Sequence, residues 1–311
     1  MTEKTPIGSQ TVIAVAPAHI GFQSLGDKVT ELSAAAELET RSTLRRIGGE
    51  HKWAAIELDV TLGETSADEA RQILERGLAG LGDVALIPSA ARRKKLLISD
   101  MDSTIIEQEC LDELAGYAGL KDEIAAITAR AMAGELDFEG ALTERVGKLA
   151  GLSLGALDKC FSERISLMPG ALTLTATMQA HGAYCLLVSG GFTYFTSRVA
   201  DQAGFHDHRG NTLIDDGEVL TGAVGQPILG REAKLDALVA AANHQSIGHQ
   251  DVIAMGDGAN DLAMIQAAGL GVAVHAKPIV AAASDAAIKI TDLTAALYFQ
   301  GFSDSEIVWR D

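Results

Sequence analysis

Apolar and polar positions in the first 90 residues follow a pattern that predicts a small mixed domain. Residues 11–16 form an apolar run typical of a strand, and residues 26–38 carry apolar side chains at helical spacing. Further strands are predicted at 40–48, 53–61 and 83–87, with a second helix over 66–80. The resulting order, β-α-β-β-α-β, is the ferredoxin-like unit, so we expect an α+β domain over residues 1–90.

The rest of the chain repeats short apolar strands followed by helical segments. Strands are expected at 96–99, 183–188, 251–255 and 271–274. This alternation favours a doubly wound parallel sheet, whose sites lie beyond the carboxyl ends of the strands. Over 80 residues separate the first two of these strands, and residues 113–168 are almost entirely helical in pattern. We therefore expect a helical cap inserted into a domain that spans residues 91–311.

A run of small and basic residues, Ala90–Lys95, stands between the two regions. Its composition marks a domain boundary, and we interpret it as a solvated linker. The element order of residues 1–90 resembles that of the ACT-type domains, which implies amino-acid binding and regulation. A packing or dimerisation module, and with it a homodimer, is the alternative interpretation.

Length and charge narrow the functions that this chain can have. A chain of 311 residues has room for two domains, and 42 acidic against 25 basic side chains give a net charge of −17. That charge repels nucleic-acid phosphates and anionic membranes, so neither is an expected partner. The three cysteines lack metal-site spacing, and we recognise neither a signal peptide nor an apolar run of about 18 residues. We expect a cytoplasmic protein.

The strand at 96–99 runs directly into Asp100-Met101-Asp102, so two carboxylates leave one strand end two positions apart. Alternation along an extended chain puts both on the same side. One carboxylate can attack phosphorus while the other protonates the leaving oxygen, a division of labour that phosphate-ester hydrolysis can use. Asp100 and Asp102 are therefore the candidate nucleophile and general acid–base.

The next two strand ends carry complementary groups. Ser189-Gly190-Gly191 offers a hydroxyl and backbone N–H groups at a helix start, which is suited to phosphate oxygens. Asp257 and Asp261 lie on a glycine-rich loop, and such carboxylates suit a hard cation with oxygen ligands. Four carboxylates would repel a phosphate unless a metal and an ammonium were present, and Lys234 is the candidate ammonium.

These segments, in this order, closely resemble the haloacid dehalogenase superfamily over about residues 95–295: DMDST at 100–104, SGG at 189–191, Lys234, and GDGAND at 256–261. The resemblance implies a Rossmann-like sheet with a helical cap inserted after its first strand. Within the superfamily, residues in and before the cap make the chain resemble the phosphoserine phosphatases in particular. They are Glu109, Met132, Phe138 and Arg145.

The resemblance implies hydrolysis of L-phosphoserine to L-serine and phosphate through a phospho-aspartate on Asp100, the last step of serine biosynthesis. Glu109 and Arg145 are expected to hold the substrate's ammonium and carboxylate, beneath Met132 and Phe138. The groups expected around the phosphate are Ser189, Gly190 and Lys234, and Asn260 is expected to contact either the substrate or its phosphate.

Magnesium is the cofactor that the resemblance implies. Its expected ligands are the Asp100 carboxylate, the backbone carbonyl of Asp102, and Asp257, with Asp261 supporting them. Two alternatives stay open for the function. One is a phosphatase or phosphotransferase acting on another small phosphometabolite, and the other is an amino-acid-sensing regulator that works through residues 1–90.

Overall fold

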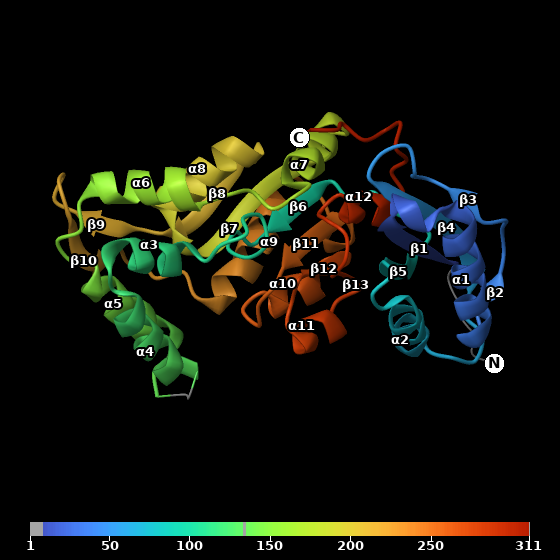
Figure 1. Cartoon of the computed structure of the whole chain (residues 1–311), viewed down its shortest axis with the longest axis horizontal. Coiled ribbons are helices and arrows are strands. Elements are labelled where there is room, and N and C mark those ends of the chain that lie inside the picture. The colour runs from blue at the N-terminus through green and yellow to red at the C-terminus, as the bar shows by residue number, and fades with distance from the viewer. Residues whose placement is uncertain (1–8, 133–134, 311) are drawn as a thin grey trace.

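The computed structural model describes residues 9–132 and 135–310, and its elements form one elongated molecule (Figure 1). An 11-stranded sheet runs through it in the order β2-β4-β1-β5-β13-β12-β11-β6-β7-β8, with β3 added beside β4. The N-terminal elements lie at one end of this sheet, and helices α4 and α5 lie towards the other end of the molecule. No described helix is both long and apolar enough to cross a membrane.

The N-terminal unit has the predicted ferredoxin-like order. Its central strand β1 (Gln10–Pro17) pairs antiparallel with both β4 (Trp53–Thr61) and β5 (Asp83–Pro88). Helices α1 (Phe22–Ala35) and α2 (Ala67–Leu78) contribute Leu25, Val29 and Leu74 to one apolar core with the sheet. A 3-10 helix, η1 (Ala18–Ile20), follows β1.

The strand predicted at 40–48 is broken into two short pieces, so that part of the prediction is wrong. Strands β2 (Glu39–Thr40) and β3 (Arg45–Arg46) pair separately with β4. All four of their residues are exposed, so no buried face holds the intervening segment in the ladder.

The C-terminal part of the sheet is parallel, as predicted. Strands β6 (Leu96–Ser99) and β11 (Val252–Gly256) are buried throughout and lie at its centre. The remaining parallel strands are β7 (Tyr184–Phe192), β8 (Asp207–Asn211), β12 (Leu270–Val274) and β13 (Ala286–Ile288). The associated helices are α7 (Ala171–Ala180), α8 (Thr193–Ala203), α9 (Arg231–His244), η2 (His249–Asp251), α10 (Leu262–Ala267), α11 (Pro278–Ala282) and α12 (Ala295–Phe299).

Strand β7 is longer than expected, because it continues through Ser189-Gly190-Gly191 to Phe192. Its pairing with β8 shifts register between Val188 and Phe192. The glycine segment is therefore an irregular continuation of the strand, and helix α8 begins only at Thr193.

Two sheets that the sequence separates are joined edge to edge. Strand β5 pairs antiparallel with β13 through Ala85 and Ala286. The buried Asp83 carboxylate accepts hydrogen bonds from the backbone N–H groups of Lys289 (2.9 Å) and Thr291 (2.8 Å), and the Asp292 carboxylate accepts one from the Trp53 indole (3.0 Å). Buried side chains thus cross from one unit to the other.

The basic run at 90–95 takes part in this junction. Arg92 has a side chain only 12% exposed and pairs with Glu57 on β4 at 2.6 Å, whereas the Lys95 side chain is 63% exposed. Interpreting the run as a solvated linker is therefore wrong for Arg92. Arg93, the next residue, pairs with Glu306 near the C-terminus at 2.7 Å. The segment therefore forms ion pairs with both units as well as connecting them.

Four of the helices between β6 and β7 cover the segment that the sequence predicts to be a cap: α3 (Cys110–Ala118), α4 (Lys121–Met132), α5 (Phe138–Lys148) and α6 (Leu154–Arg164). The cap starts slightly before residue 113. The carboxylate of Asp137 accepts a hydrogen bond from the Gly140 N–H and so caps α5 at its start. A hairpin of β9 (Leu213–Asp215) and β10 (Leu220–Val224) packs against α5.

Candidate active site

The first strand end brings its two carboxylates together as predicted. The Asp100 N–H donates to the Met255 carbonyl, which continues the β6–β11 ladder one residue beyond the strand. Asp100 and Asp102 then line one cavity of about 450 Å³, while Met101 between them is buried in the apolar core. Ser103 next adopts a positive φ of 53°, which turns the chain away from the sheet.

The Ser189-Gly190-Gly191 segment lies against these carboxylates. The Ser189 hydroxyl donates to Asp102 Oδ2 at 2.9 Å, and the Cys110 N–H donates to Asp102 Oδ1 at 2.8 Å. A Cβ at Gly191 would stand 3.0 Å from Asp102 Oδ2, so the absent side chain permits this close approach. Both oxygens of Asp102 are thereby held in place beside Asp100.

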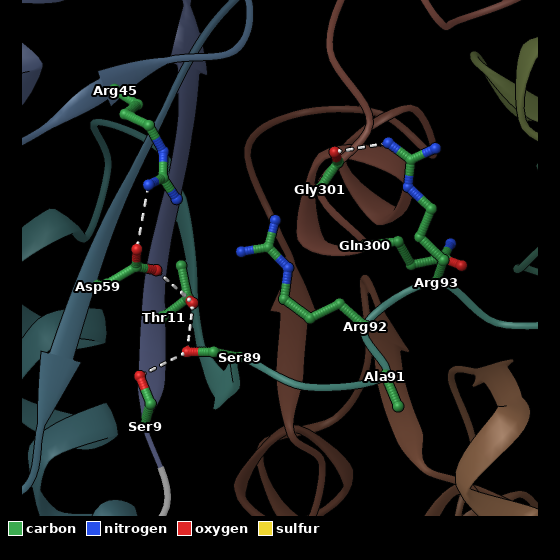
Figure 2. A pocket seen from close by; sticks show the side chains of 10 residues that line it. All are labelled: Ser9, Thr11, Arg45, Asp59, Ser89, Ala91, Arg92, Arg93, Gln300 and Gly301. Carbon is green, nitrogen blue, oxygen red and sulfur yellow. Dashed lines mark hydrogen bonds and ion pairs between the residues drawn. The ribbon is translucent and has the colours of Figure 1, made fainter. Parts of the chain in front are cut away.

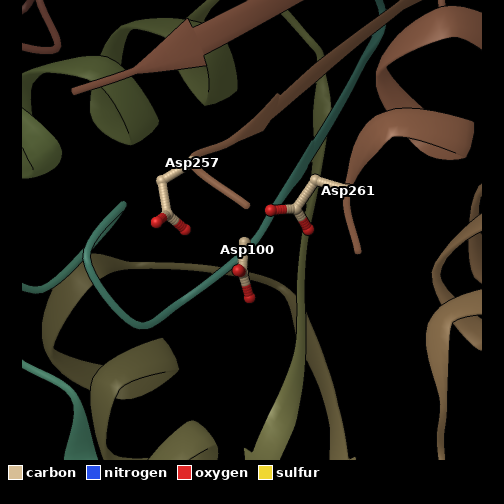
Figure 3. Close-up of side chains that lie close together, drawn as sticks. All are labelled: Asp100, Asp257 and Asp261. Carbon is tan, nitrogen blue, oxygen red and sulfur yellow. The ribbon is translucent and has the colours of Figure 1, made fainter. Parts of the chain in front are cut away.

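Three carboxylates lie close together at the cavity, and two of them, Asp100 and Asp257, line it. Those of Asp100, Asp257 and Asp261 each offer an oxygen within 4.8 Å of the others. Figure 3 shows the three side chains. Asp257 lines the cavity, whereas Asp261 is fully buried and both of its oxygens accept hydrogen bonds, from Lys234 and from the Gly258 N–H. Such an all-oxygen donor set fits a hard divalent cation.

Lys234 is the predicted ammonium of the site. Its Nζ lies 2.8 Å from Asp100 Oδ1 and 2.5 Å from Asp261 Oδ1, and its side chain is 3% exposed. Burial lowers the pKa of Lys234, but the two carboxylates more than reverse this and hold the pKa above its ordinary value. Lys234 therefore remains charged.

One ammonium is too little positive charge for this cluster. Burial raises the pKa of Asp257 to about 6, and the nearby Asp261 carboxylate adds to the rise. Burial also raises the pKa of Asp100, although Lys234 opposes that rise. A bound divalent cation would favour the ionised form of these carboxyls, so the residues present fit a metal.

The predicted serine-binding residues meet on the cap side of the same cavity. Glu109, Phe138 and Arg145 all line it. The Arg145 Nε donates to the Ala141 carbonyl at 3.2 Å, which holds the arginine stem along α5. Phe138 lies directly over Gly190, because a Cβ at that glycine would be 3.3 Å from the phenyl ring.

Two other predicted contacts have different outcomes. Asn260 lines the cavity beside Asp257. Met132 ends helix α4, but its side chain lies outside the part of the chain that the structure describes.

Sequence reasoning missed three polar residues at this site. Arg231 and Lys277 line the cavity and are exposed, so each adds a positive charge at its rim. Buried Asn211 donates to the Gly190 carbonyl at 2.8 Å and accepts from the Leu229 N–H at 2.7 Å. It joins the Ser189–Gly191 segment to the loop that leads into the Lys234 helix. Arg231 lies three residues before Lys234 in the sequence, a spacing that puts both on the same face of a helix. That spacing could have indicated Arg231 as a second cation of the site.

Comparisons with known proteins agree with this geometry. A family profile described as haloacid dehalogenase-like hydrolase matches residues 97–266, which is over half of the chain. The chain belongs to the haloacid dehalogenase-like hydrolases. The phosphatases of this family generally use a divalent metal. The predicted superfamily is thus confirmed.

Several of the similar proteins are named phosphoserine phosphatases. The Streptomyces coelicolor phosphoserine phosphatase is 38% identical over 91% of this chain and 70% of its own length. A solved structure of a probable phosphoserine phosphatase from Vibrio cholerae has a TM-score of 0.73 at 30% identity and covers 97% of this chain and 89% of its own. A haloacid dehalogenase-family hydrolase from Salmonella enterica has a TM-score of 0.82 at 29% identity, covering 93% and 98%.

Proposed function

We propose that this chain hydrolyses L-phosphoserine to L-serine and phosphate through a phospho-aspartate on Asp100, the last step of serine biosynthesis. The relatives named above support the activity. The observation that carries the substrate assignment is a carboxylate and a guanidinium, Glu109 and Arg145, in the cavity that contains Asp100. Phosphoserine has an ammonium and a carboxylate beside its phosphate, which these two side chains complement.

The mechanism assigns one carboxylate to each task. Asp100 attacks phosphorus in line, while Asp102 gives a proton to the departing serine oxygen and later takes one from the hydrolytic water. The hydrogen bonds from Ser189 and Cys110 hold Asp102 for both steps. Ser189, the Gly190 backbone N–H and Lys234 stabilise the charge on the transferring phosphoryl group.

Magnesium is the proposed cofactor. The Asp100 carboxylate, the Asp102 backbone carbonyl and Asp257 would hold it, with Asp261 oriented by Lys234 and Gly258 behind them. When bound, it screens the phosphate from the carboxylates and neutralises charge in the transition state. Loss of turnover after chelation is the expected consequence.

The N-terminal unit has a separate proposed role. We assign residues 1–90 to an ACT-like regulatory or dimerisation domain and residues 91–311 to the phosphatase domain, with a cap at about residues 113–168. The ferredoxin-like strand order supports the first assignment. None of the described residues of this unit lines the catalytic cavity.

Replacing Arg145 tests the substrate. Arg145→Ala is expected to lower kcat/KM for L-phosphoserine at least about tenfold, because a charge-assisted hydrogen bond contributes about 1.5 to 3 kcal/mol. Hydrolysis of 4-nitrophenyl phosphate, which lacks both amino-acid groups, is expected to change little. Steady-state kinetics with the two substrates measures the difference.

A matched control for that experiment is Arg130→Ala. Arg130 lies on the cap as well, but it pairs with Glu144 at 2.7 Å and does not line the cavity. It should leave both substrates nearly unaffected. Equal losses on both substrates with Arg145→Ala would instead mean that Arg145 contacts the phosphate or packs the cap. The assignment of phosphoserine as substrate would then lose its main support, whereas the proposal of phosphatase activity would be unaffected.

Glu109 predicts a pH dependence specific to the amino-acid substrate. It is open to solvent through the cavity, yet burial of its carboxylate and the nearby Asp102 raise the pKa of Glu109 to about 7. Below that pH the carboxyl is neutral and loses its attraction for the substrate ammonium, so kcat/KM for L-phosphoserine should fall as pH decreases through 7.

The same profile with 4-nitrophenyl phosphate corrects for titration of the phosphate itself, whose second pKa is about 6. The ratio of the two profiles should lose its pH dependence in Glu109→Gln. A ratio that keeps the same slope in that variant would rule out Glu109 as the titrating group.

A further inference from the structure

A second cavity, of about 530 Å³, lies where the N-terminal unit meets the catalytic part of the chain (Figure 2). Its wall combines strands β1, β3 and β4, the connecting segment at 89–93, and the turn after α12. None of its lining residues lines the catalytic cavity. The residues are Ser9, Thr11, Arg45, Asp59, Ser89, Ala91, Arg92, Arg93, Gln300 and Gly301.

This cavity is less acidic than the chain as a whole. Among the residues that the structure describes, its charged lining residues are three arginines and one carboxylate, Asp59. Glu57 stands behind the wall and pairs with two of these arginines. Glu306 pairs with the third, Arg93, so Asp59, Glu57 and Glu306 match the three arginines in number. The cavity is therefore close to neutral, in a protein with a net charge of −17. Guanidinium N–H groups that these pairs leave unused can bind an anion there.

Each arginine is anchored through only part of its guanidinium. Arg45 uses Nε for Glu57 (3.0 Å) and Nη1 for Asp59 (3.1 Å), while Arg92 pairs with Glu57 through Nη2 (2.6 Å). Arg93 pairs with Glu306 through Nη2 and its guanidinium carbon lies 4.2 Å from the centre of the Phe302 ring. A guanidinium has five N–H donors, so each retains donors for a ligand while its position is fixed.

Hydroxyl groups complete the opposite wall. Thr11 donates to Asp59 at 2.9 Å, Ser89 lies 2.8 Å from Thr11, and Ser9 lies 3.1 Å from Ser89 (Figure 2). Across from them, a Cβ at Gly301 would be 1.9 Å from the Arg92 guanidinium, so a glycine at that position leaves room for Arg92. The cavity thus has Arg92 and Arg93 on one side, and Arg45 with the hydroxyls on the other.

We propose that this cavity binds a small organic anion, recognised through carboxylate or phosphate groups by Arg45, Arg92 and Arg93 and through its hydroxyl groups by Thr11 and Ser89. Its volume lies in the range of small-molecule sites. The ligand contacts both the N-terminal unit and the catalytic part, so binding opposes their separation and stabilises the folded chain.

The test is thermal unfolding of the full chain with citrate or with inorganic phosphate as the probe, at constant ionic strength. EDTA keeps metal from drawing anions to the catalytic carboxylates. A saturable rise in Tm is expected with at least one probe, and which probe acts distinguishes carboxylate from phosphate recognition. Arg45→Gln and Arg93→Gln should each weaken the apparent affinity at least about tenfold.

Lys95→Gln is the matched control, because it removes a positive charge from the same basic run at a residue that does not line the cavity. It should bind the probe as the unsubstituted chain does. Equal stabilisation of all four proteins, or a rise in Tm that never saturates with either probe, would overturn the proposal, since the anions would then act elsewhere or as bulk salt.

Discussion

Asp100→Asn is expected to abolish turnover, with a loss on the order of 10⁴-fold or more, because an amide cannot form the phospho-enzyme. The fold should survive. The substitution removes one buried charge from a cluster that is short of positive charge, and Lys234 keeps Asp261 as its partner. A change of no more than about 2 kcal/mol in unfolding free energy is therefore expected.

Acid quenching after mixing with 4-nitrophenyl [³²P]phosphate separates the roles of the two carboxylates. The unsubstituted chain should retain label, and Asp100→Asn should retain none. Asp102→Asn should react about 10² to 10⁴-fold more slowly with L-phosphoserine, since general acid–base catalysis contributes that much. It should still accept label from this good leaving group. Activity near the unsubstituted level in a folded Asp100→Asn protein would exclude the covalent route.

Much of this site could be predicted because its groups stand next to short buried strands. Asp100 and Asp102 follow β6, and Asp257 follows β11, its neighbour in the sheet. Strand ends of a parallel sheet meet at one edge, so position along the sequence is enough to bring these carboxylates together. Lys234 needed the further argument that clustered acids require a cation.

Residues that depend on tertiary packing were beyond local patterns. Asn211 sits at the end of β8 and acts through buried hydrogen bonds to Gly190 and Leu229, which no spacing rule relates. From the sequence alone, Arg92 is interpreted as part of a solvated basic run, because only the folded chain brings Glu57 next to it. The short β2 and β3 pieces depend on how two exposed segments meet β4.

Lys234→Met is expected to cause the largest loss of stability. Removing one partner from a buried ion pair costs about 3 to 5 kcal/mol, since the remaining charge has neither water nor a counter-ion. Here two buried carboxylates, Asp100 and Asp261, lose their ammonium together. Urea unfolding in EDTA should show the loss, and Lys277→Met, which removes an exposed lysine from the cavity rim, should change stability by less than about 1 kcal/mol.

Metal and pH distinguish an unpaired charge from a simple packing defect. Magnesium should recover more stability in Lys234→Met than in the unsubstituted chain, because a cation there supplies the missing charge. Without Lys234 to oppose it, burial raises the pKa of Asp100 further above its unfolded value. The folded state then binds more protons than the unfolded state, so the deficit should shrink as pH falls from 8 to 5. A deficit unchanged by magnesium and by pH would mean that the methionine disturbs packing and that the carboxylates were never paired as ions.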